Sequence, residues 1–522
     1  MNVGSLLPRH AESRPEHLAV VCGPHRQTFR EHAARVNRVA HALLSLGLGK
    51  GDVVAIMLTN RVELLEIYRA CALLGLVSVP LSPLMRGAGL ATLLRDSGAR
   101  AIVTAHETLP VVDEARADLA TLPVGRCIVV DAAPGSPYTD YATMTASASA
   151  ETPVPPDIGD DDVYNIIYSS GTTGEPKGIV HTHYVRALYG ALFASQFRFT
   201  PESVVMHGGS LVFNGAFVTL MPAWFLGCTF VLQERFDAEL FIETVARERV
   251  THVMMVPSQI VALLGAPNFS REKLQSLQML CSVGAPWHRE HKERLLAVLP
   301  DALYELYGLT EGFITVLDRN DFTSHIESVG RPIPFSAMRI VGDDGRTLTP
   351  GAIGEIVGRS PLMMQGYHGR PDLTQAAVKD GWLHTGDVGY VDADGFLHLA
   401  DRKKDLIISG GVNVYPKDIE EIAVQHPDVS EVAVFGAVHD KWGETPVAAV
   451  VLRAGAVADA DRIRAWVNAR VSARYQQLHA VILVDEFPRS TAGKTLKRVL
   501  RDQYANMCRS PDTSERPEGA SI

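Results

Sequence analysis

The feature that most constrains the fold is the repeated alternation of helical and strand patterns between residue 28 and about residue 130. Apolar residues recur at spacings of three and four from Phe29 to Leu43, which is typical of a helix with one apolar face. A continuous apolar run, Val53 to Leu58, follows, and a second helical pattern covers Val62 to Leu74. Strands that are apolar on both faces and separated by helices indicate a parallel sheet between helical layers. The sequence therefore predicts an α/β fold.

The alternation continues beyond this region with one interruption. Residues 133–162 are rich in proline, serine, threonine and aspartate, and they predict a long surface connection. The segment Leu280–Pro286 predicts a buried strand that ends in a tight turn, a place where α/β sheets commonly bind ligands. Strands are also expected at residues 77–79, 101–103, 127–130, 163–168 and 253–256, and helices from about residue 183 and over residues 289–298.

From Ile353 the pattern changes to short β-like segments separated by turns. The turn Asp392-Ala-Asp-Gly395 lies between apolar runs and predicts a hairpin. Expected strands at 432–435, 448–452 and 481–484, with a helix over 461–473, indicate a small α+β domain. Because 522 residues exceed a single ordinary core, we expect several domains. The predicted boundaries are 1–403 for an N-terminal domain, 404–505 for a C-terminal domain and 506–522 for a disordered tail.

The net charge of −10 disfavours nucleic acid and anionic membrane surfaces as partners. The six cysteines are scattered without metal-ligand spacing, so most are expected to be buried apolar residues in a reducing compartment. Neither a signal peptide nor a membrane span is expected, since the longest apolar stretch, Ala70 to Leu81, is too short to cross a bilayer. The sequence predicts a soluble, cytoplasmic protein.

The segment Tyr168–Gly178 has the composition of a phosphate-binding loop. Its glycines are Gly171, Gly174 and Gly178, its hydroxyl-bearing residues are Ser169, Ser170, Thr172 and Thr173, and its cation is Lys177. Glycines permit positive φ angles and close approach of backbone N–H groups to an anion. The spacing differs from that of the Walker P-loop. A polar surface loop is the alternative interpretation from this segment alone.

Five motifs in order resemble the adenylate-forming superfamily, which comprises acyl-CoA synthetases, adenylation domains of peptide synthetases, and luciferases. The motifs are Tyr168–Gly178, Tyr307–Glu311, Gly386-Asp387, Asp401-Arg402 and Gly493-Lys494, and the resemblance covers residues from about 28 to 500. It implies a large N-terminal domain of α/β sandwich subdomains with a small β-barrel-like subdomain, followed by a small mobile α+β domain. It also implies two steps: a carboxylate attacks the α-phosphorus of ATP, and a thiol then displaces AMP.

The resemblance assigns most of the nucleotide site by motif. Thr310 would contact the α-phosphate, and Glu311 would hold Mg²⁺, because a hard cation prefers carboxylate oxygen. Asp387 and Arg402 would contact the ribose, and Lys494 would bridge the acyl carboxylate and the α-phosphate as a point charge. The β- and γ-phosphates would be held by Ser169, Ser170, Gly171, Thr172, Thr173, Gly174 and Lys177, the adenine by Gly284, Ala285 and Pro286, and the AMP moiety also by Tyr307 and Gly308.

The resemblance also gives roles to residues of the predicted C-terminal domain. Lys404 would be the hinge about which this domain rotates between the two steps, since hinges are often residues at the ends of elements. Ser409, Gly410 and Gly411 would line the tunnel for the pantetheine arm of coenzyme A, because glycine allows close approach of a thin group. A charged linker is the alternative interpretation of the Lys404 region.

The acyl pocket is expected to include Phe213, Asn214, Phe217 and Gly312. Many relatives carry histidine where this chain has Asn214, and amino-acid-activating relatives carry an aspartate near this position. Because asparagine carries no charge to pair with an amino group, an α-amino acid substrate is disfavoured. An apolar pocket suits an aromatic, alicyclic or steroid-derived, or medium-chain aliphatic acid. That Phe213 and Phe217 belong only to the core stays an alternative.

The combined prediction is an ATP-dependent acyl-CoA synthetase that uses Mg²⁺ and coenzyme A and acts on a hydrophobic carboxylic acid. Transfer to a carrier protein is one alternative, although the short sequence after Lys494 favours coenzyme A. A luciferase-like oxidation is disfavoured because the C-terminal Ala-Ser-Ile lacks a peroxisomal tripeptide. A silent nucleotide-binding regulator is disfavoured by the retention of Glu311, Asp387 and Lys494. A homodimer is left open.

Overall fold

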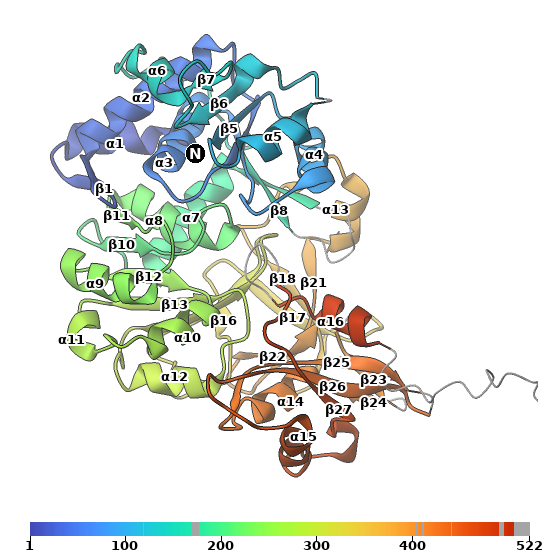
Figure 1. The fold of residues 1–522 in the computed structure, drawn as a ribbon. Helices are drawn as coiled ribbons and strands as arrows, with labels where there is room; N and C mark the ends of the chain where they lie inside the picture. The colour runs from blue at the N-terminus through green and yellow to red at the C-terminus, as the bar shows by residue number, and fades with distance from the viewer. Residues whose placement is uncertain are drawn as a thin grey trace, which may run out of the picture.

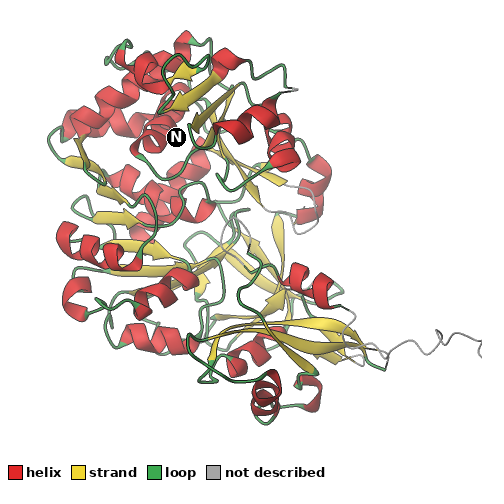
Figure 2. Cartoon of the chain, viewed as in Figure 1, coloured by secondary structure: helices red, strands yellow, loops and turns green. Residues whose placement is uncertain are grey.

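The computed structural model describes residues 1–117, 119–169, 177–402, 405–409, 412–439, 441–489 and 495–505. Within these residues the strands form four sheets, and helices cover the two larger ones (Figures 1 and 2). This arrangement confirms the predicted fold class, a large mixed α/β part followed by a small α+β part. None of the described helices is both long and apolar enough to cross a membrane.

The first sheet has eight strands in the order β19-β9-β8-β4-β3-β5-β6-β7. Strands β3 to β8 pair in parallel, as the apolar sequences of β3, β4, β5, β6 and β8 predicted. Strand β7 was not predicted, because it lies in the segment 133–162. The strands are β3 Val53–Met57, β4 Val77–Pro80, β5 Ala101–Ala105, β6 Cys127–Val130, β7 Thr139–Asp140, β8 Val163–Ser169, β9 Lys177–Thr182 and β19 Gly366–Tyr367. The helices before β9 are α1 Leu6–Ser13, α2 Phe29–Ser45, α3 Val62–Leu74, α4 Gly87–Asp96, α5 Leu109–Arg116 and α6 Tyr141–Ala146.

The second sheet has nine strands in the order β16-β15-β14-β13-β12-β10-β11-β1-β2. Its central strands, β10 to β14, run parallel, so their carboxyl ends meet at one edge. The strands are β1 Leu18–Cys22, β2 His25–Thr28, β10 Val204–His207, β11 Thr229–Leu232, β12 His252–Met255, β13 Met279–Val283, β14 Leu303–Gly308, β15 Ile314–Leu317 and β16 Arg331–Pro332. The helices of this region are α7 His183–Gln196, α8 Phe217–Leu226, α9 Ala238–Glu248, α10 Pro257–Gly265, α11 Arg271–Leu274 and α12 Arg289–Leu296.

Helices α7 and α8 pack against each other between these two sheets (Figure 1). The largest hydrophobic cluster accordingly contains residues from both sheets, among them Ile56 of β3 and Phe230 of β11, together with Phe193 of α7 and Leu220 of α8. One continuous core therefore holds the two large sheets together.

The third sheet has five antiparallel strands and takes the place of the predicted β subdomain. The hairpin predicted at Asp392–Gly395 is confirmed, because β21 and β22 pair on either side of it and Gly395 has a φ of 86°. The elements of this region are β17 Ala337–Val341, β18 Gly354–Arg359, α13 Pro371–Ala377, β20 Val378–Lys379, β21 Trp382–Val391 and β22 Leu397–Arg402.

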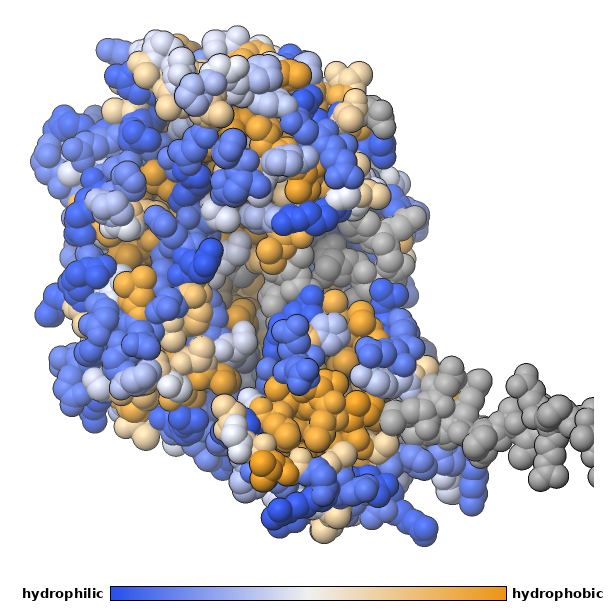
Figure 3. Space-filling model, in the orientation of Figure 1, coloured by the Kyte–Doolittle hydropathy of each residue, from blue (hydrophilic) through white to orange (hydrophobic). Residues whose placement is uncertain are grey.

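The fourth sheet belongs to the small C-terminal part and has a core of its own, which includes Val434, Ala448 and Ile463. Figure 3 shows an apolar area over this sheet and mostly hydrophilic residues on the rest of the visible face. The elements are β23 Ile407–Ser409, β24 Val412–Val414, α14 Pro416–Ala423, β25 Val429–His439, β26 Gly443–Leu452, α15 Ala460–Asn468, β27 Ala480–Leu483 and α16 Lys497–Tyr504. The predicted boundary at residues 403 and 404 and the predicted disordered tail, 506–522, lie outside the described residues.

The C-terminal part rests on α12 and β22 through polar contacts. His288 Nδ1 lies 3.1 Å from Glu421 Oε1, and Lys417 Nζ donates to the Leu399 carbonyl oxygen at 3.0 Å. Burial alone would raise the pKa of the Glu421 carboxyl, but the contacts with His288, together with the charges of Lys417 and Lys292, lower that pKa below its usual value. Polar contacts of this kind can be exchanged for water.

Two local predictions were wrong. Residues 133–162 are not only a surface connection, because they contain helix α6, which Asp140 caps and whose Tyr141 hydroxyl donates to Glu66 Oε2 at 2.6 Å. Strand β9 was not predicted at all. Gly178 lies in this strand and does not have a positive φ; a Cβ there would lie 2.9 Å from Ile166 Cγ2, so close packing explains this glycine.

The predicted burial of the cysteines is confirmed for the five that the structure describes. They are buried and form no disulfide: Cys22, Cys71, Cys127, Cys228 and Cys281. Burial raises the pKa of the Cys71 thiol to about 12, so it stays protonated at neutral pH and behaves as a small apolar group. Cys508 lies outside the described residues.

Gly330 gives a prediction about stability, because it combines a φ of 84° with close contact to the backbone. A Cβ at Gly330 would lie 1.9 Å from the Val316 carbonyl carbon, whereas Gly345 has a φ of 76° and no atom within 4 Å of its Cβ position. Gly345→Ala should therefore cost only the left-handed strain, about 1 kcal/mol. Gly330→Ala should cost at least about 3 kcal/mol, because strand β15 must also move. Urea unfolding followed by circular dichroism measures both, and equal losses would contradict this account.

Candidate functional site

The candidate site is built at the carboxyl edge of β13 and β14, where two predicted segments lie side by side. The parallel register pairs Ser282 with Glu305 and Val283 with Leu306, so the residues that follow these strands are neighbours. After β13, Gly284 turns the chain with a φ of 95°, and Ala285 and Pro286 are exposed. After β14, the chain enters the loop that contains Thr310 and Glu311. The predicted adenine segment and the predicted α-phosphate loop therefore share one sheet edge.

A hydrogen bond joins this edge to the third sheet. The Tyr307 hydroxyl at the end of β14 donates to Asp387 Oδ2 at 2.8 Å, and Asp387 is buried on β21. In the β21–β22 ladder, Asp387 is the direct partner of Arg402. The two predicted ribose contacts are thus neighbours across one hairpin. The side chain of Arg402 lies outside the described atoms.

The loop between β14 and β15 has a fixed backbone. Gly312 N–H donates to the Leu309 carbonyl at 3.0 Å, and Met364 N–H donates to the Glu311 carbonyl at 2.9 Å. Gly312 has a φ of 108°, and a Cβ there would lie 2.0 Å from the Leu362 carbonyl oxygen. Only glycine fits this position, so the structure gives Gly312 a packing role; its predicted place in the acyl pocket stays a prediction.

Tyr367 connects two of the predicted phosphate-binding residues, and sequence reasoning missed it. Its hydroxyl donates to Glu311 Oε1 at 2.8 Å, and Lys177 Nζ lies 5.2 Å from the centre of its ring. Burial, followed by the charge of Glu311, raises the pKa of the Tyr367 hydroxyl, which therefore stays a donor at neutral pH. The pairing of β19 with β9 places Tyr367 beside Ile179. No local sequence signal marks such a tyrosine, because the contact depends on strand pairing.

The predicted phosphate loop lies between two paired strands. Ser169, the last residue of β8, pairs with Lys177, the first residue of β9. The segment between them is thus attached at both ends to an antiparallel ladder near Glu311. Ser170, Gly171, Thr172, Thr173 and Gly174 lie outside the described residues, as does the side chain of Ser169.

A buried polar network lies beside the predicted acyl pocket. The fully buried Arg186 of α7 donates through Nη2 to Asn214 Oδ1 at 2.8 Å and through Nε to Asn165 Oδ1 at 3.1 Å. Its Nη2 also lies 3.2 Å from His181 Nδ1, and His181 Nε2 lies 2.8 Å from the Thr310 carbonyl oxygen. Burial lowers the pKa of Arg186 to about 10. The network links Asn214 to the predicted α-phosphate loop.

The sequence contains a pattern that indicates a buried position for Arg186. It precedes Tyr189 by three residues and Phe193 by seven, so it shares their buried face of α7. Arg186 packs over the ring of Phe217, with 4.2 Å from Cζ to the ring centre. Phe217 is fully buried and belongs to the main core, whereas Phe213 and Asn214 are half-buried. Phe213 and Asn214 are therefore better placed than Phe217 to face a ligand.

The residues predicted in the C-terminal part are only partly described. Ser409 ends β23 and pairs with Gly443. Lys404, Gly410, Gly411 and Lys494 lie outside the described residues. The hinge, the pantetheine tunnel and the catalytic lysine stay predictions.

The predicted Mg²⁺ site has one described carboxylate, that of Glu311. Among the described residues there is no group of three or more side chains that could hold a metal ion. This agrees with Mg²⁺ chemistry, because Mg²⁺ is often held by one or two carboxylates together with substrate phosphates and water. Glu311 is half-buried and its Oε1 accepts from the Tyr367 hydroxyl, so its carboxylate is placed to contribute oxygen to such a donor set.

Comparison with known proteins identifies the family. The family model of the AMP-binding enzyme matches residues 7–368, and that of the AMP-binding enzyme C-terminal domain matches residues 418–494. The chain belongs to the AMP-binding enzyme family. This confirms the predicted adenylate-forming resemblance and the AMP-forming ligase class.

Individual relatives match over nearly the full length. A feruloyl-CoA synthase from Amycolatopsis sp is 35% identical over 96% of this chain and 99% of its own. A fatty acid–[acyl-carrier-protein] ligase from Streptomyces coeruleorubidus is 31% identical over 95% of each chain. The structure of ATP-bound MatB from Rhodopseudomonas palustris superimposes with a TM-score of 0.88 at 30% identity, over 98% of this chain and 100% of that one. The two sequence relatives are thus named for different acids, ferulate and fatty acid, and the MatB structure is that of an ATP-bound protein.

The Tyr307–Asp387 hydrogen bond gives a prediction about nucleotide binding. Tyr307→Phe removes the donor that holds the Asp387 carboxylate, and a hydrogen bond to a charged group contributes about 1.5 kcal/mol. We expect ATP to bind about tenfold more weakly, as measured by isothermal titration calorimetry without any acid present. Tyr390→Phe, on the same strand β21, should leave ATP affinity unchanged. Unchanged or tighter binding by Tyr307→Phe would show that Asp387 needs no positioning by Tyr307.

Proposed function

We propose that this protein is an ATP-dependent acyl-CoA synthetase that activates a hydrophobic carboxylic acid as acyl-AMP and then transfers the acyl group to coenzyme A. The observation that carries the proposal is the convergence of Tyr307–Asp387 and of Glu311–Tyr367–Lys177 at the β13–β14 edge. These groups come from four separate segments, and in a member of the AMP-binding family they suit a triphosphate nucleotide. The roles that we propose for individual residues rest on the same family membership.

In the first step, a carboxylate oxygen of the acid forms a bond with the α-phosphorus, and the bond from phosphorus to pyrophosphate breaks. Phosphoryl transfer depends mainly on positioning and charge stabilisation. Lys177 and the loop before it would stabilise the charge of the departing pyrophosphate, and Thr310 would orient the α-phosphate. Asp387, held by Tyr307, would accept hydrogen bonds from the ribose hydroxyls. Glu311 would hold Mg²⁺, which supplies charge neutralisation at the phosphates when bound.

Two further proposed roles belong to residues outside the described set. Lys494 would bridge the acid carboxylate and the α-phosphate, which lowers the repulsion between two anions. In the second step, the thiolate of coenzyme A attacks the acyl carbon, and the bond to AMP breaks. Rotation of residues 404–505 about Lys404 would bring Ser409 and its two glycines to the pantetheine arm. The polar contacts of His288 and Lys417 would break in such a movement.

The proposed acid is aromatic, alicyclic or steroid-derived, or medium-chain aliphatic. Asn214 is uncharged and its carbonyl oxygen accepts from Arg186, so it offers no carboxylate for a substrate amino group. The relatives named for ferulate and for fatty acids lie within this range. Homodimer formation stays a prediction.

The acceptor has one supported alternative. One matching relative is named as a ligase for an acyl carrier protein, and its match covers 95% of this chain. The competing proposal is therefore transfer to a carrier protein in place of coenzyme A. The two acceptors share the pantetheine thiol, so the described residues fit either one.

The proposal is tested by a panel of aliphatic, aryl and steroid-derived acids, with AMP release measured without acceptor, with coenzyme A and with a phosphopantetheinylated carrier protein. We expect at least one hydrophobic acid to give AMP release that coenzyme A accelerates at least about tenfold, because the thiol clears the bound adenylate. Preference for the carrier protein would support the alternative. No pyrophosphate or AMP release with any acid would overturn the proposal.

Lys494 gives a prediction that separates the two steps. Lys494→Ala should reduce ATP–pyrophosphate exchange at least about a hundredfold, since it removes the charge that stabilises the reacting anions. Thioester formation from pre-made acyl-adenylate should continue at close to the normal rate. Arg498→Ala, at an exposed position of α16, is the matched control and should keep both activities. Full exchange activity in Lys494→Ala would contradict the assigned role.

A further inference from the structure

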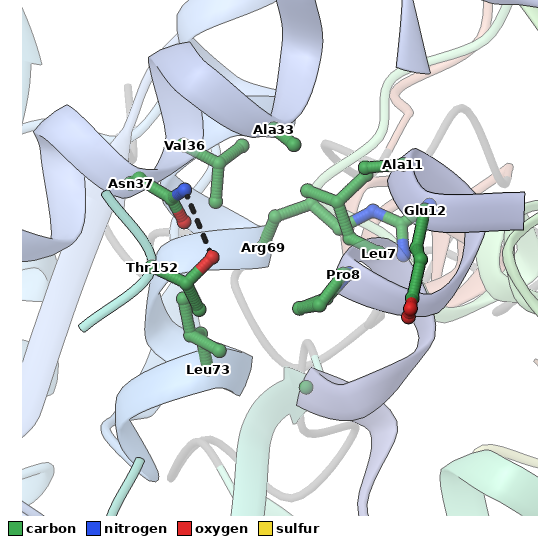
Figure 4. A pocket seen from close by; sticks show the side chains of 11 residues that line it. Leu7, Pro8, Ala11, Glu12, Ala33, Val36, Asn37, Arg69, Leu73 and Thr152 are labelled. Carbon is green, nitrogen blue, oxygen red and sulfur yellow. Dashed lines mark hydrogen bonds between the residues drawn. The ribbon is translucent and has the colours of Figure 1, made fainter. Parts of the chain in front are cut away.

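A cavity lies away from the candidate site, among the helices of the N-terminal region. Its volume is about 260 Å³, and it is enclosed by α1, α2, α3 and the segment near Thr152. Most of its wall is apolar, with Leu7 from α1, Val36 from α2 and Leu73 from α3 (Figure 4). The cavity also has one buried cation, Arg69 of α3.

Arg69 is 5% exposed and has no counterion among the described residues. Its Nε and Nη1 atoms are buried and have no hydrogen-bond partner. The guanidinium lies over the ring of Trp224, 3.7 Å from its centre, and Figure 4 shows the side chain reaching from α3 toward α1 beside Ala11 and Glu12. Burial lowers the pKa of Arg69 to about 9. An unpaired buried charge is costly, so an anionic partner in this cavity would be strongly favoured.

The nearest buried acid is already occupied. Glu66 lies one turn before Arg69 on α3, but its carboxylate pairs with Arg35 and accepts the Tyr141 hydroxyl. It also accepts from Gln27 Nε2 at 3.4 Å. Arg69 therefore cannot obtain its counterion from Glu66. Arg35 has a carboxylate partner, whereas Arg69 has none among the described residues. Arg69 is therefore the guanidinium that can bind an anionic ligand.

The other charged and titratable groups around the cavity define the charge that a ligand can carry. Glu12 lines the rim and is exposed, and it forms no ion pair with Arg69. Burial and then the charge of Arg69 lower the pKa of His10, and the same two causes, with Arg35 also contributing, lower the pKa of His32 to about 3. Both imidazoles are therefore neutral at pH 7. With one cation inside and one carboxylate at the rim, the cavity suits a single negative charge.

The remaining polar groups of the wall are engaged. Asn37 Nδ2 donates to the Ala150 carbonyl oxygen at 2.9 Å and to Thr152 Oγ1 at 3.2 Å. Asn37 and Thr152 close one side of the cavity. Arg69 is therefore the main side chain of the wall whose hydrogen-bond donors are left for a ligand. A guanidinium binds a carboxylate through two parallel hydrogen bonds, which makes it selective for planar anions.

We propose that this cavity binds a small apolar monocarboxylate, whose carboxylate pairs with Arg69 and whose hydrocarbon or aromatic body contacts Leu7, Val36 and Leu73. The volume limits the ligand to a compact acid of about ten non-hydrogen atoms. The site is separate from the proposed acyl pocket, because none of Phe213, Asn214, Phe217 and Gly312 lines this cavity.

The direct test uses 4-bromobenzoate as the probe and crystals of the full chain. The bromine atom is located by anomalous scattering, so binding in this cavity is distinguished from binding in the proposed acyl pocket, and either can fail without the other. We expect a bromine peak in the cavity, with the carboxylate within hydrogen-bond distance of Arg69. Bromine peaks only elsewhere, or no peak at all, would overturn the proposal.

Solution titrations with substituted proteins provide the second test. Arg69→Met should remove the cavity site, with at least tenfold weaker binding there, and should keep the fold, because an apolar side chain replaces an unpaired charge. Arg69→Lys should bind with intermediate affinity, and Glu12→Gln should bind more tightly by severalfold. Inorganic phosphate should bind at least tenfold more weakly than 4-bromobenzoate. Undiminished binding by Arg69→Met, equal binding of phosphate, or binding at crystal concentration only would overturn the proposal.

Discussion

The parallel pairing of β10, β12, β13 and β14 is the constraint on which the candidate site depends. Parallel strands that are buried on both faces bring their carboxyl ends to one edge, and the turns that follow them have to be neighbours. The Gly284 turn and the Thr310–Glu311 loop meet there. The side-chain chemistry of the site is therefore placed by the sheet rather than by any local sequence.

Three hydrogen bonds connect this edge to other parts of the molecule. Tyr307 reaches Asp387 in the third sheet, Tyr367 brings β19 to Glu311, and His181 of β9 contacts the Thr310 carbonyl. Each bond joins residues that are at least 56 positions apart in the sequence. Because of these hydrogen bonds, the positions of Asp387, Glu311 and Thr310 depend on how the separate sheets pack. A small shift between the sheets would therefore move these three residues relative to one another.

Two buried arginines show how differently the same residue type can be accommodated. Arg186 gives hydrogen bonds to Asn165 and Asn214 and packs over aromatic rings, so most of its charge is stabilised within the protein. Among the described residues Arg69 has no counterion; it lies over the ring of Trp224 and beside a mostly apolar cavity. The first arginine organises the predicted acyl pocket, and the second leaves binding capacity for a ligand.

The sequence by itself determined the fold class, the family resemblance and most regular elements. Helix α3 was predicted with its observed bounds, Val62–Leu74, because its helical pattern ends at Gly75, and β3 was predicted within one residue, because it is a continuous apolar run. Strand β9 was missed because its lysine, glycine and histidine have low strand preference and are stabilised in the strand by pairing with β8 and β19. The tertiary structure alone decided that Tyr367 contacts Glu311, that Arg186 donates to Asn214 and that no residue in the described part of the chain pairs with the charge of Arg69. The physical reason is the same in each case: hydrogen bonds and charge pairs depend on distances of a few ångströms between distant segments, which packing sets and periodicity does not encode.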